Sequence, residues 1–346
     1  MPTPKEFTNA SMAFLAYTGE SIKVEPTTVF QIANQINQLL PTYPNLNNDW
    51  QIIWGPALYS SDELDLKKQA NLTFVAQSRS TPTSYIVATR GTVGDNIWEW
   101  LSEDLEAELL PWPTPSALKQ APYVSKATTD ALTVVLSTIP PTTVPAGYSP
   151  LPGAGTSLAD FLASLTGHGA IEICFTGHSL GGAIAPGLAL WFKQAQGNVS
   201  IPQNDIYYPM PAWDVNATAS ISCVSLAGPT PGNQVFSRYF GDLLKDNYDR
   251  IYNTNDAVPH GFAELGQLEA LYEPSISMTD LEEAGLDAFR LRVLQEEAEK
   301  LTYYANLPNS NPFTCPVNPA DPTYSSQALY QHINAYELQF NLPIAS

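Results

Sequence analysis

The sequence of 346 residues has few basic residues, and this shortage excludes one class of partner. Its 15 lysines and arginines stand against 34 aspartates and glutamates, which gives a formal charge of −19. A chain of this charge repels phosphate backbones, so nucleic acid is excluded as a partner. Charged residues make up only 14% of the chain and apolar residues 44%, and this balance excludes a disordered chain.

Cysteines and long apolar runs are also scarce. The three cysteines cannot pair evenly and show no C-x-x-C spacing, so we expect free thiols. No H-E-x-x-H motif or acidic metal cluster is present, and we expect neither a metal nor a cofactor. The longest apolar stretch, residues 181–192, is shorter than the roughly 18 residues of a membrane span, so we expect no transmembrane segment.

The N-terminus lacks a basic start followed by an apolar block, so no signal peptide is visible. The scarcity of basic residues and the 30 prolines nevertheless resemble a secreted enzyme after processing. Four N-x-S/T sequons add to this resemblance, at Asn9, Asn71, Asn198 and Asn216. Secretion and a cytoplasmic location therefore both stay open.

Strand-like runs alternate with helical patterns along most of the chain. This alternation predicts an α/β fold with a mainly parallel central sheet and helices on both faces. The two runs at 72–77 and 85–89 flank a polar turn and predict a hairpin. The other predicted elements are strands at 50–54, 171–175, 221–226 and 250–252 and a helix at 180–194.

Two segments are predicted to be insertions in a single domain of residues 1–346. Residues 138–155 are rich in proline, glycine and threonine and predict a loop. Residues 279–304 predict a helix, because Thr279 and Glu282 fit a capping box and apolar residues follow at steps of three and four. These apolar residues are Leu281, Ala284, Ala288, Leu291, Leu294, Ala298 and Leu301. We expect this stripe to cover the core and not to bind a partner.

A G-x-S-x-G motif stands between the predicted strand at 171–175 and the helix that follows. It comprises Gly177-His178-Ser179-Leu180-Gly181. A sharp turn there would hold Ser179 in a strained conformation, and the glycines would let the strand and the helix pass closely. The hydroxyl of Ser179 would then stand above the sheet at the positive end of the helix dipole. The alternative is a glycine-rich turn whose serine only caps the helix.

A serine nucleophile needs a carboxylate and a histidine, in the chain order Ser, Asp/Glu, His for this type of turn. Asp256 follows the predicted strand at 250–252 and would lie at the sheet edge where the serine emerges. His332 is the candidate base. The remaining histidines precede the serine, adjoin it or lie too near the acid: His168, His178 and His260. A turn-capping aspartate and a surface histidine are the alternatives.

Five blocks of sequence occur together in this chain. They are Thr89-Arg90-Gly91-Thr92, residues 176–182, Ala227-Gly228-Pro229-Thr230-Pro231-Gly232-Asn233, residues 255–259 and His332. With these blocks the sequence resembles the class 3 lipases, the fungal-type triacylglycerol lipases of the α/β-hydrolase fold. The resemblance implies a triad of Ser179, Asp256 and His332. It also implies an oxyanion hole formed by Thr92 and the backbone N–H of Leu180.

The segment 96–110 has an apolar stripe of Trp98, Leu101, Leu105 and Leu109 among several carboxylates. It predicts an amphipathic helix, either a lid over the site or an ordinary surface helix. The resemblance favours the lid, with Trp98, Trp100, Leu101 and Leu105 as substrate-binding residues. The family's Trp-x-x-Asp-Leu lid region corresponds here to residues 100–105, which are one residue longer.

The sequence thus predicts a carboxylic ester hydrolase, in the first place a triacylglycerol lipase that acts at a lipid–water interface. A phospholipase A1 or a feruloyl-type esterase would use the same triad. A non-catalytic lipid-binding protein of the same fold is the alternative from another class.

Overall fold

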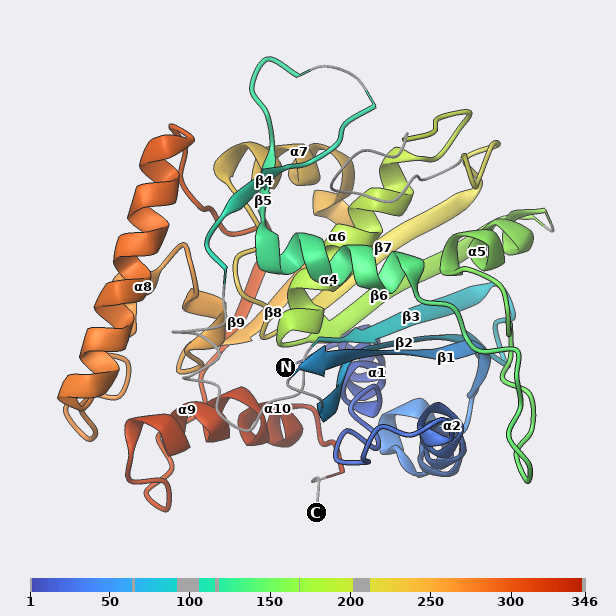
Figure 1. Ribbon diagram of the computed structural model, residues 1–346, viewed down its shortest axis with the longest axis horizontal. Coiled ribbons are helices and arrows are strands. Elements are labelled where there is room, and N and C mark those ends of the chain that lie inside the picture. The colour runs from blue at the N-terminus through green and yellow to red at the C-terminus, as the bar shows by residue number, and fades with distance from the viewer. Residues whose placement is uncertain are drawn as a thin grey trace.

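The computed structural model describes residues 2–63, 66–91, 106–115, 118–167, 169–201 and 212–343 (Figure 1). The side chains of residues 61–63 and 66–68 are not described. Several predicted site residues lie outside the described residues, and with them most of the predicted lid helix: Thr92, Trp98, Trp100, Leu101 and Leu105. The lid prediction is wrong at its C-terminal end, because Leu109 is the first residue of a strand.

In the described part of the chain, a seven-stranded sheet has the order β1-β2-β3-β6-β7-β8-β9. The strands are β1 Trp50–Glu63, β2 Leu66–Ser78, β3 Ser84–Arg90, β6 Ile171–His178, β7 Ala219–Leu226, β8 Tyr248–Asn253 and β9 Ser310–Phe313. β1, β2 and β3 pair antiparallel, so the predicted hairpin is confirmed. From β3 to β9 every pair is parallel, which confirms the mainly parallel sheet.

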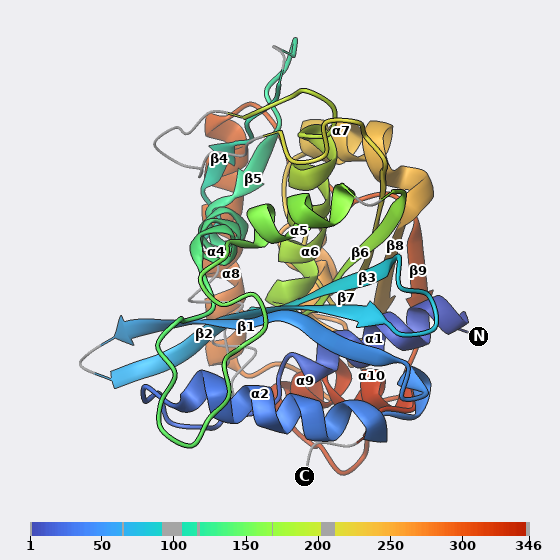
Figure 2. The ribbon, with the colours of Figure 1, turned by 90° about the vertical axis from the view of Figure 1, so that its right-hand side faces the viewer.

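Helices cover both faces of this sheet, as predicted (Figures 1 and 2). One face carries α4 Lys126–Ser137, α5 Leu158–Thr166, α6 Leu180–Gln194 and α7 Gln234–Leu244. The long helix α8 Asp280–Glu299 lies along one flank of the molecule. The opposite face carries α1 Pro4–Leu15, α2 Thr28–Leu39, α9 Tyr324–His332 and α10 Asn334–Gln339. Short 3₁₀ turns and a two-stranded sheet of β4 Leu109–Pro111 and β5 Tyr123–Ser125 complete the described elements.

Alternation along the strands divides the apolar side chains between two cores, because successive residues of a strand point to opposite faces. In β6, Ile173 and Phe175 pack under α6, whereas Cys174 between them faces the layer of α1 and α10. Each half of the core is therefore closed by its own set of helices. None of the helices in the described ranges has the length and apolar character to cross a membrane.

Residues 138–155 form the predicted loop, and a helix occupies most of 279–304, but it ends at Glu299 and buries a different face from the one predicted. Residues 138–155 contain no helix or strand, and α8 begins with the predicted capping box of Thr279 and Glu282. The residues that α8 buries are Leu286, Phe289 and Val293. The predicted stripe was therefore wrong as a core face, because all of its members are exposed: Leu281, Ala284, Ala288, Leu291, Leu294, Ala298 and Leu301.

Candidate active site

The turn from β6 into α6 places Ser179 at the carboxyl end of the sheet. Its backbone has φ +60° and ψ −131°, a conformation that few residues other than glycine adopt, and this confirms the predicted strain. The Ser179 N–H donates to the carbonyl oxygen of Leu226 at 3.1 Å, and the Ser179 carbonyl accepts from Gly182 at 2.8 Å. These two hydrogen bonds, one from the N–H and one to the carbonyl of Ser179, hold the turn in place. The Ser179 side chain stays partly exposed.

The glycines of the motif are required by close backbone approach. A Cβ on Gly177 would lie 2.3 Å from the Gly181 oxygen, and one on Gly181 would lie 2.4 Å from the Thr89 oxygen. The end of β3 therefore touches the start of α6. A Cβ on Gly91 would likewise lie 2.3 Å from the Cβ of Leu180, so the chain that leads to Thr92 passes directly beside Leu180.

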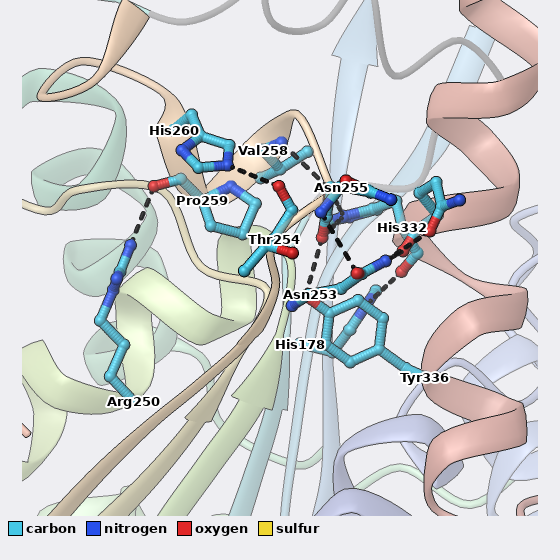
Figure 3. Close-up of polar contacts among 12 residues, drawn as sticks. His178, Arg250, Asn253, Thr254, Asn255, Val258, Pro259, His260, His332 and Tyr336 are labelled. Carbon is cyan, nitrogen blue, oxygen red and sulfur yellow. Dashed lines mark hydrogen bonds and ion pairs between the residues drawn. The ribbon is translucent and has the colours of Figure 1, made fainter. Parts of the chain in front are cut away.

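Asp256 and His332 lie in contact, although 76 residues separate them in the chain. Asp256 follows β8 and is fully buried, whereas His332 ends α9 and is 2% exposed. The Nδ1 of His332 lies 3.0 Å from Asp256 Oδ1 and 2.9 Å from Oδ2 (Figure 3). A carboxylate only accepts, so Nδ1 carries the proton and Nε2 of a neutral ring has a free lone pair.

Tyr336 is a third member of this cluster that the sequence did not reveal. Its hydroxyl donates to Asp256 Oδ2 at 2.9 Å and accepts from the backbone N–H of Asn253, also at 2.9 Å (Figure 3). The Val258 N–H donates to the other oxygen of Asp256 at 3.0 Å. Burial, and then the charge of Asp256, raise the pKa of Tyr336 well above 10, so it stays a hydrogen-bond donor.

Asn253 connects the loop of Asp256 to α9. Its side-chain amide donates to Gln331, to the side-chain oxygen at 2.6 Å and to the backbone oxygen at 3.1 Å. Its side-chain oxygen accepts from the backbone N–H groups of Asn255 and Cys315. Because Gln331 directly precedes His332, these bonds fix the distance between the loop of the acid and the helix of the base.

His178, directly before Ser179, contacts the backbone of His332. Its Nε2 donates to the His332 carbonyl oxygen at 2.8 Å, and the two rings lie 4.6 Å apart between centroids. Burial, and then the neighbouring His332, hold the pKa of His178 well below 6.5. His178 is thus a neutral donor that joins the serine turn to the end of α9. No sequence motif predicted this role.

The structure shows no hydrogen bond between Ser179 and His332. The Nε2 of His332 is buried and has no hydrogen-bond partner among the described residues. Beside the serine, the hydroxyl of Tyr17 donates to the His178 carbonyl oxygen at 3.0 Å and also interacts with the Ser179 side chain. Serine–histidine contacts are often long in substrate-free hydrolases and shorten when substrate binds.

His260 makes other contacts. Its Nδ1 lies 2.8 Å from a carboxylate oxygen of Glu264, and its Nε2 lies 3.1 Å from the carbonyl oxygen of Thr254 (Figure 3). Both ring nitrogens are therefore engaged with acceptors. Among the described residues, no group of three or more His, Cys, Asp or Glu side chains could hold a metal ion. The three cysteines are free thiols.

Comparison with known proteins reveals one family. The sequence profile of the family described as Lipase (class 3) matches residues 86–265. Among solved structures, M37 lipase is 25% identical with a TM-score of 0.78, over 98% of this chain and 92% of that chain. No curated protein matches the chain.

Two further solved structures have lower scores. Lip2 lipase from Yarrowia lipolytica is 15% identical with a TM-score of 0.48, over 94% of this chain and 84% of that chain. Lipase II from Rhizopus niveus is 20% identical with a TM-score of 0.44, over 74% of each chain.

The segment that matches the family profile is just over half of the chain and contains the serine turn and Asp256. The strand order, the strained Ser179 and the helices on both faces are those of an α/β-hydrolase. The chain therefore belongs to the class 3 lipase family and is a lipase-type hydrolase of the α/β-hydrolase fold.

Proposed function

We propose that the protein hydrolyses carboxylic esters with Ser179 as nucleophile, His332 as general base and Asp256 as the acid that orients the base. Triacylglycerols at a lipid–water interface are the proposed substrates. The observation that carries the proposal is the buried contact of His332 with Asp256 beside a serine held at φ +60°. Membership in the class 3 lipase family supports it.

The reaction starts with proton transfer. The Nε2 of His332 takes the proton from Ser179 while the serine oxygen attacks the ester carbonyl carbon. Asp256 holds the Nδ1 proton, selects the reactive tautomer and stabilises the imidazolium that forms. Its other donors, Tyr336 and Val258, keep the carboxylate in the orientation that this tautomer requires.

The negative charge that develops on the carbonyl oxygen needs preorganised donors. We propose that Leu180 and Thr92 supply them. The backbone N–H of Leu180 is the first of α6, where the N–H groups of a helix have no partner within the helix and the dipole is positive. The packing of Gly91 against Leu180 supports a position of Thr92 at the same oxygen.

The acyl-enzyme then forms and breaks down along the same route. His332 gives its proton to the leaving alcohol, and the ester bond to Ser179 remains. A water molecule then gives a proton to His332 and attacks the acyl carbon, which releases the fatty acid and restores the serine. Trp98, Trp100, Leu101 and Leu105 are the proposed lid and acyl-chain contacts.

We also propose that residues 1–346 form one domain, with 138–155 and 279–304 as insertions. The likeness to M37 lipase, which extends over 98% of this chain, supports a single domain.

Labelling with a fluorophosphonate probe tests the nucleophile. We expect the wild type and the Ser164→Ala control, an exposed serine of α5, to be labelled and active. Ser179→Ala should keep its fold, lose labelling and lose at least about a thousandfold in kcat on both soluble esters and triacylglycerol emulsions. Persistent labelling of Ser179→Ala would overturn the assignment. If the wild type hydrolysed phospholipid or feruloyl esters faster than triacylglycerols, triacylglycerols would not be its preferred substrate.

A further inference from the structure

A second histidine–carboxylate pair lies at the loop that carries Asp256. His260 ends a short 3₁₀ turn, Val258–His260, and is 3% exposed. Its Nδ1 lies 2.8 Å from a carboxylate oxygen of Glu264, and its Nε2 lies 3.1 Å from the carbonyl oxygen of Thr254 (Figure 3). Because Thr254 and His260 stand on either side of Asp256 in the chain, the ring closes the loop that contains the proposed acid.

A buried arginine holds the same loop from β8. Arg250 is 5% exposed, and its guanidinium donates to the carbonyl oxygen of Pro259 at 2.9 Å (Figure 3). At the other end of the loop, the Thr254 N–H donates to the carbonyl oxygen of Phe313 in β9 at 2.8 Å. The loop is thus fixed to β8 and β9, and the ring of His260 joins its two ends.

The two acceptors of His260 decide where its protons lie. A carbonyl oxygen and a carboxylate only accept hydrogen bonds, so a ring that donates to both carries a proton on each nitrogen. The hydrogen bond from His260, and then the charges of His260 and Arg250, lower the pKa of Glu264, so this group is a carboxylate at neutral pH. His260 is therefore an imidazolium that is paired with Glu264.

Loss of one proton from this ring to water removes one of its two hydrogen bonds. The remaining proton stays on Nδ1, because a hydrogen bond to the charged Glu264 is stronger than one to a neutral carbonyl. The Nε2 lone pair then faces the lone pairs of the Thr254 carbonyl oxygen, and the two atoms repel each other. The bond that is lost is therefore the one that closes the loop of Asp256.

The groups packed against the His260 ring come from its own segment and from β8. Glu264 follows it in the chain, and Arg250 of β8 is a second cation that Glu264 faces. The Tyr252 ring of β8 packs edge-on at 6.2 Å between centroids, with Arg250 over its face. The carboxylate of Asp256, on the same loop, has other partners. Glu264 is therefore the carboxylate that keeps the ring protonated.

We propose that His260 is a positioning residue for the triad, which holds the Asp256 loop closed while its ring is protonated and releases the loop in alkaline solution. The inference rests on the proposed function and deepens it, because it gives the acid of the triad a pH-dependent support. In the closed loop the Val258 N–H donates to Asp256 at 3.0 Å, and the carboxylate is held against His332. In the open loop this orientation is lost, so kcat falls while substrate binding is unchanged.

Glutamine in place of Glu264 separates the hydrogen bond from the charge. Its side-chain amide donates to Nδ1 of a neutral ring, which leaves the Nε2 proton on the Thr254 carbonyl in both neutral and alkaline solution. We expect kcat of the wild type on a soluble ester to fall about tenfold from neutral to alkaline pH, with KM unchanged. In Glu264→Gln the same change should stay within about twofold. The matched control is Glu269→Gln, an exposed glutamate paired with Arg290, whose kcat should fall as in the wild type.

Substitution of His260 tests the bond to Thr254 directly. His260→Leu removes both donors and should lower kcat about tenfold at neutral pH, whereas His260→Gln keeps an amide donor and should recover most of this loss. The proton resonance of His332 Nδ1, which is bonded to Asp256, should shift in His260→Leu and stay in place in His260→Gln. Equal pH profiles of the wild type and Glu264→Gln would overturn the proposal, and so would a wild-type kcat with an unshifted His332 resonance in His260→Leu.

Magnetic resonance of the wild type completes the test. Both ring nitrogens of His260 should carry a proton at neutral pH, and a single proton there would overturn the proposal. If His260→Leu is unfolded by circular dichroism, the pH profile of Glu264→Gln decides, because that substitution preserves size. If the wild type cleaves no ester, the proposed function fails, whereas the His332 resonance in the His260 variants still supports or overturns the positioning of Asp256.

Discussion

Replacement of Tyr336 by phenylalanine removes one oxygen atom at the centre of the proposed triad. The Tyr336 hydroxyl is the 2.9 Å partner of two buried groups, the carboxylate of Asp256 and the backbone N–H of Asn253. Phenylalanine preserves the ring and its edge contact with His178, whose centroid lies 5.3 Å away. The change therefore isolates the two hydrogen bonds from the packing.

The expected loss of stability is the sum of two costs. A buried backbone N–H without a partner costs about 1–3 kcal/mol, and a hydrogen bond to a charged group contributes about 1.5–3 kcal/mol. Relaxation around the site recovers part of this, so we expect the free energy of unfolding to fall by about 3 kcal/mol. Urea unfolding of both proteins at neutral pH gives the difference.

The expected catalytic effect is smaller than that of losing the acid. Asp256 keeps its contact with His332 and the N–H of Val258, so the tautomer of the base is preserved. We expect kcat on a soluble ester to fall about tenfold with little change in KM. Loss of the triad carboxylate itself lowers kcat by about 10⁴-fold.

The control for this variant is Tyr330→Phe, since Tyr330 lies on the preceding helix, α9, and is only partly buried. It should lose less than about 0.5 kcal/mol, as surface substitutions usually do. If Tyr336→Phe were equally harmless in stability and kcat, the hydroxyl would not hold Asp256, and the arrangement of the acid would need another cause.

Two further substitutions test the serine turn. His178→Phe removes the 2.8 Å bond to the His332 carbonyl, so kcat should fall while KM holds. The pKa of buried His178 lies well below 6.5, so the unfolded chain binds one more proton below about pH 6.5 and stability falls as pH drops there. Urea unfolding at several pH values should show a shallower fall in His178→Phe, and an unchanged slope would contradict the neutral, buried state. Gly181→Ala places a Cβ 2.4 Å from the Thr89 oxygen and should destabilise by about 3 kcal/mol or more, whereas Gly187→Ala meets side-chain atoms only at 3.7 Å or beyond and should be neutral or stabilising by up to about 1 kcal/mol. Equal stabilities of these two variants would contradict the close contact of β3 with α6.

Local patterns predicted most of the sheet. Each central strand is a short β-branched or apolar run bounded by turn residues, and the runs at 171–175 and 221–226 became β6 and β7 with only small extensions. The strand β9 was not predicted, because Ser310–Phe313 is mostly exposed and contains Pro312. A proline is tolerated there since β9 lies at the edge of the sheet, where one side of the strand needs no partner.

The serine turn was predictable for a different reason. Steric limits act between residues close in the chain, so Gly177 and Gly181 around Ser179 specify the turn by themselves. The pairing of Asp256 with His332 needed a further rule, the order of triad residues in this fold. Tyr336 and His178 follow no such rule, because their bonds depend on how α9 and α10 settle against the sheet.

The misassigned face of α8 shows a limit of periodicity. The predicted positions recur at steps of three and four, but they drift around the helix and alternate with exposed Glu283, Asp287 and Gln295, so spacing alone did not identify the core face. The bulkier side chains are the buried ones, a phenylalanine, a leucine and a valine, whereas nearly half of the predicted stripe is alanine, which buries little area. A stripe of leucines and alanines that loses this competition is left in water.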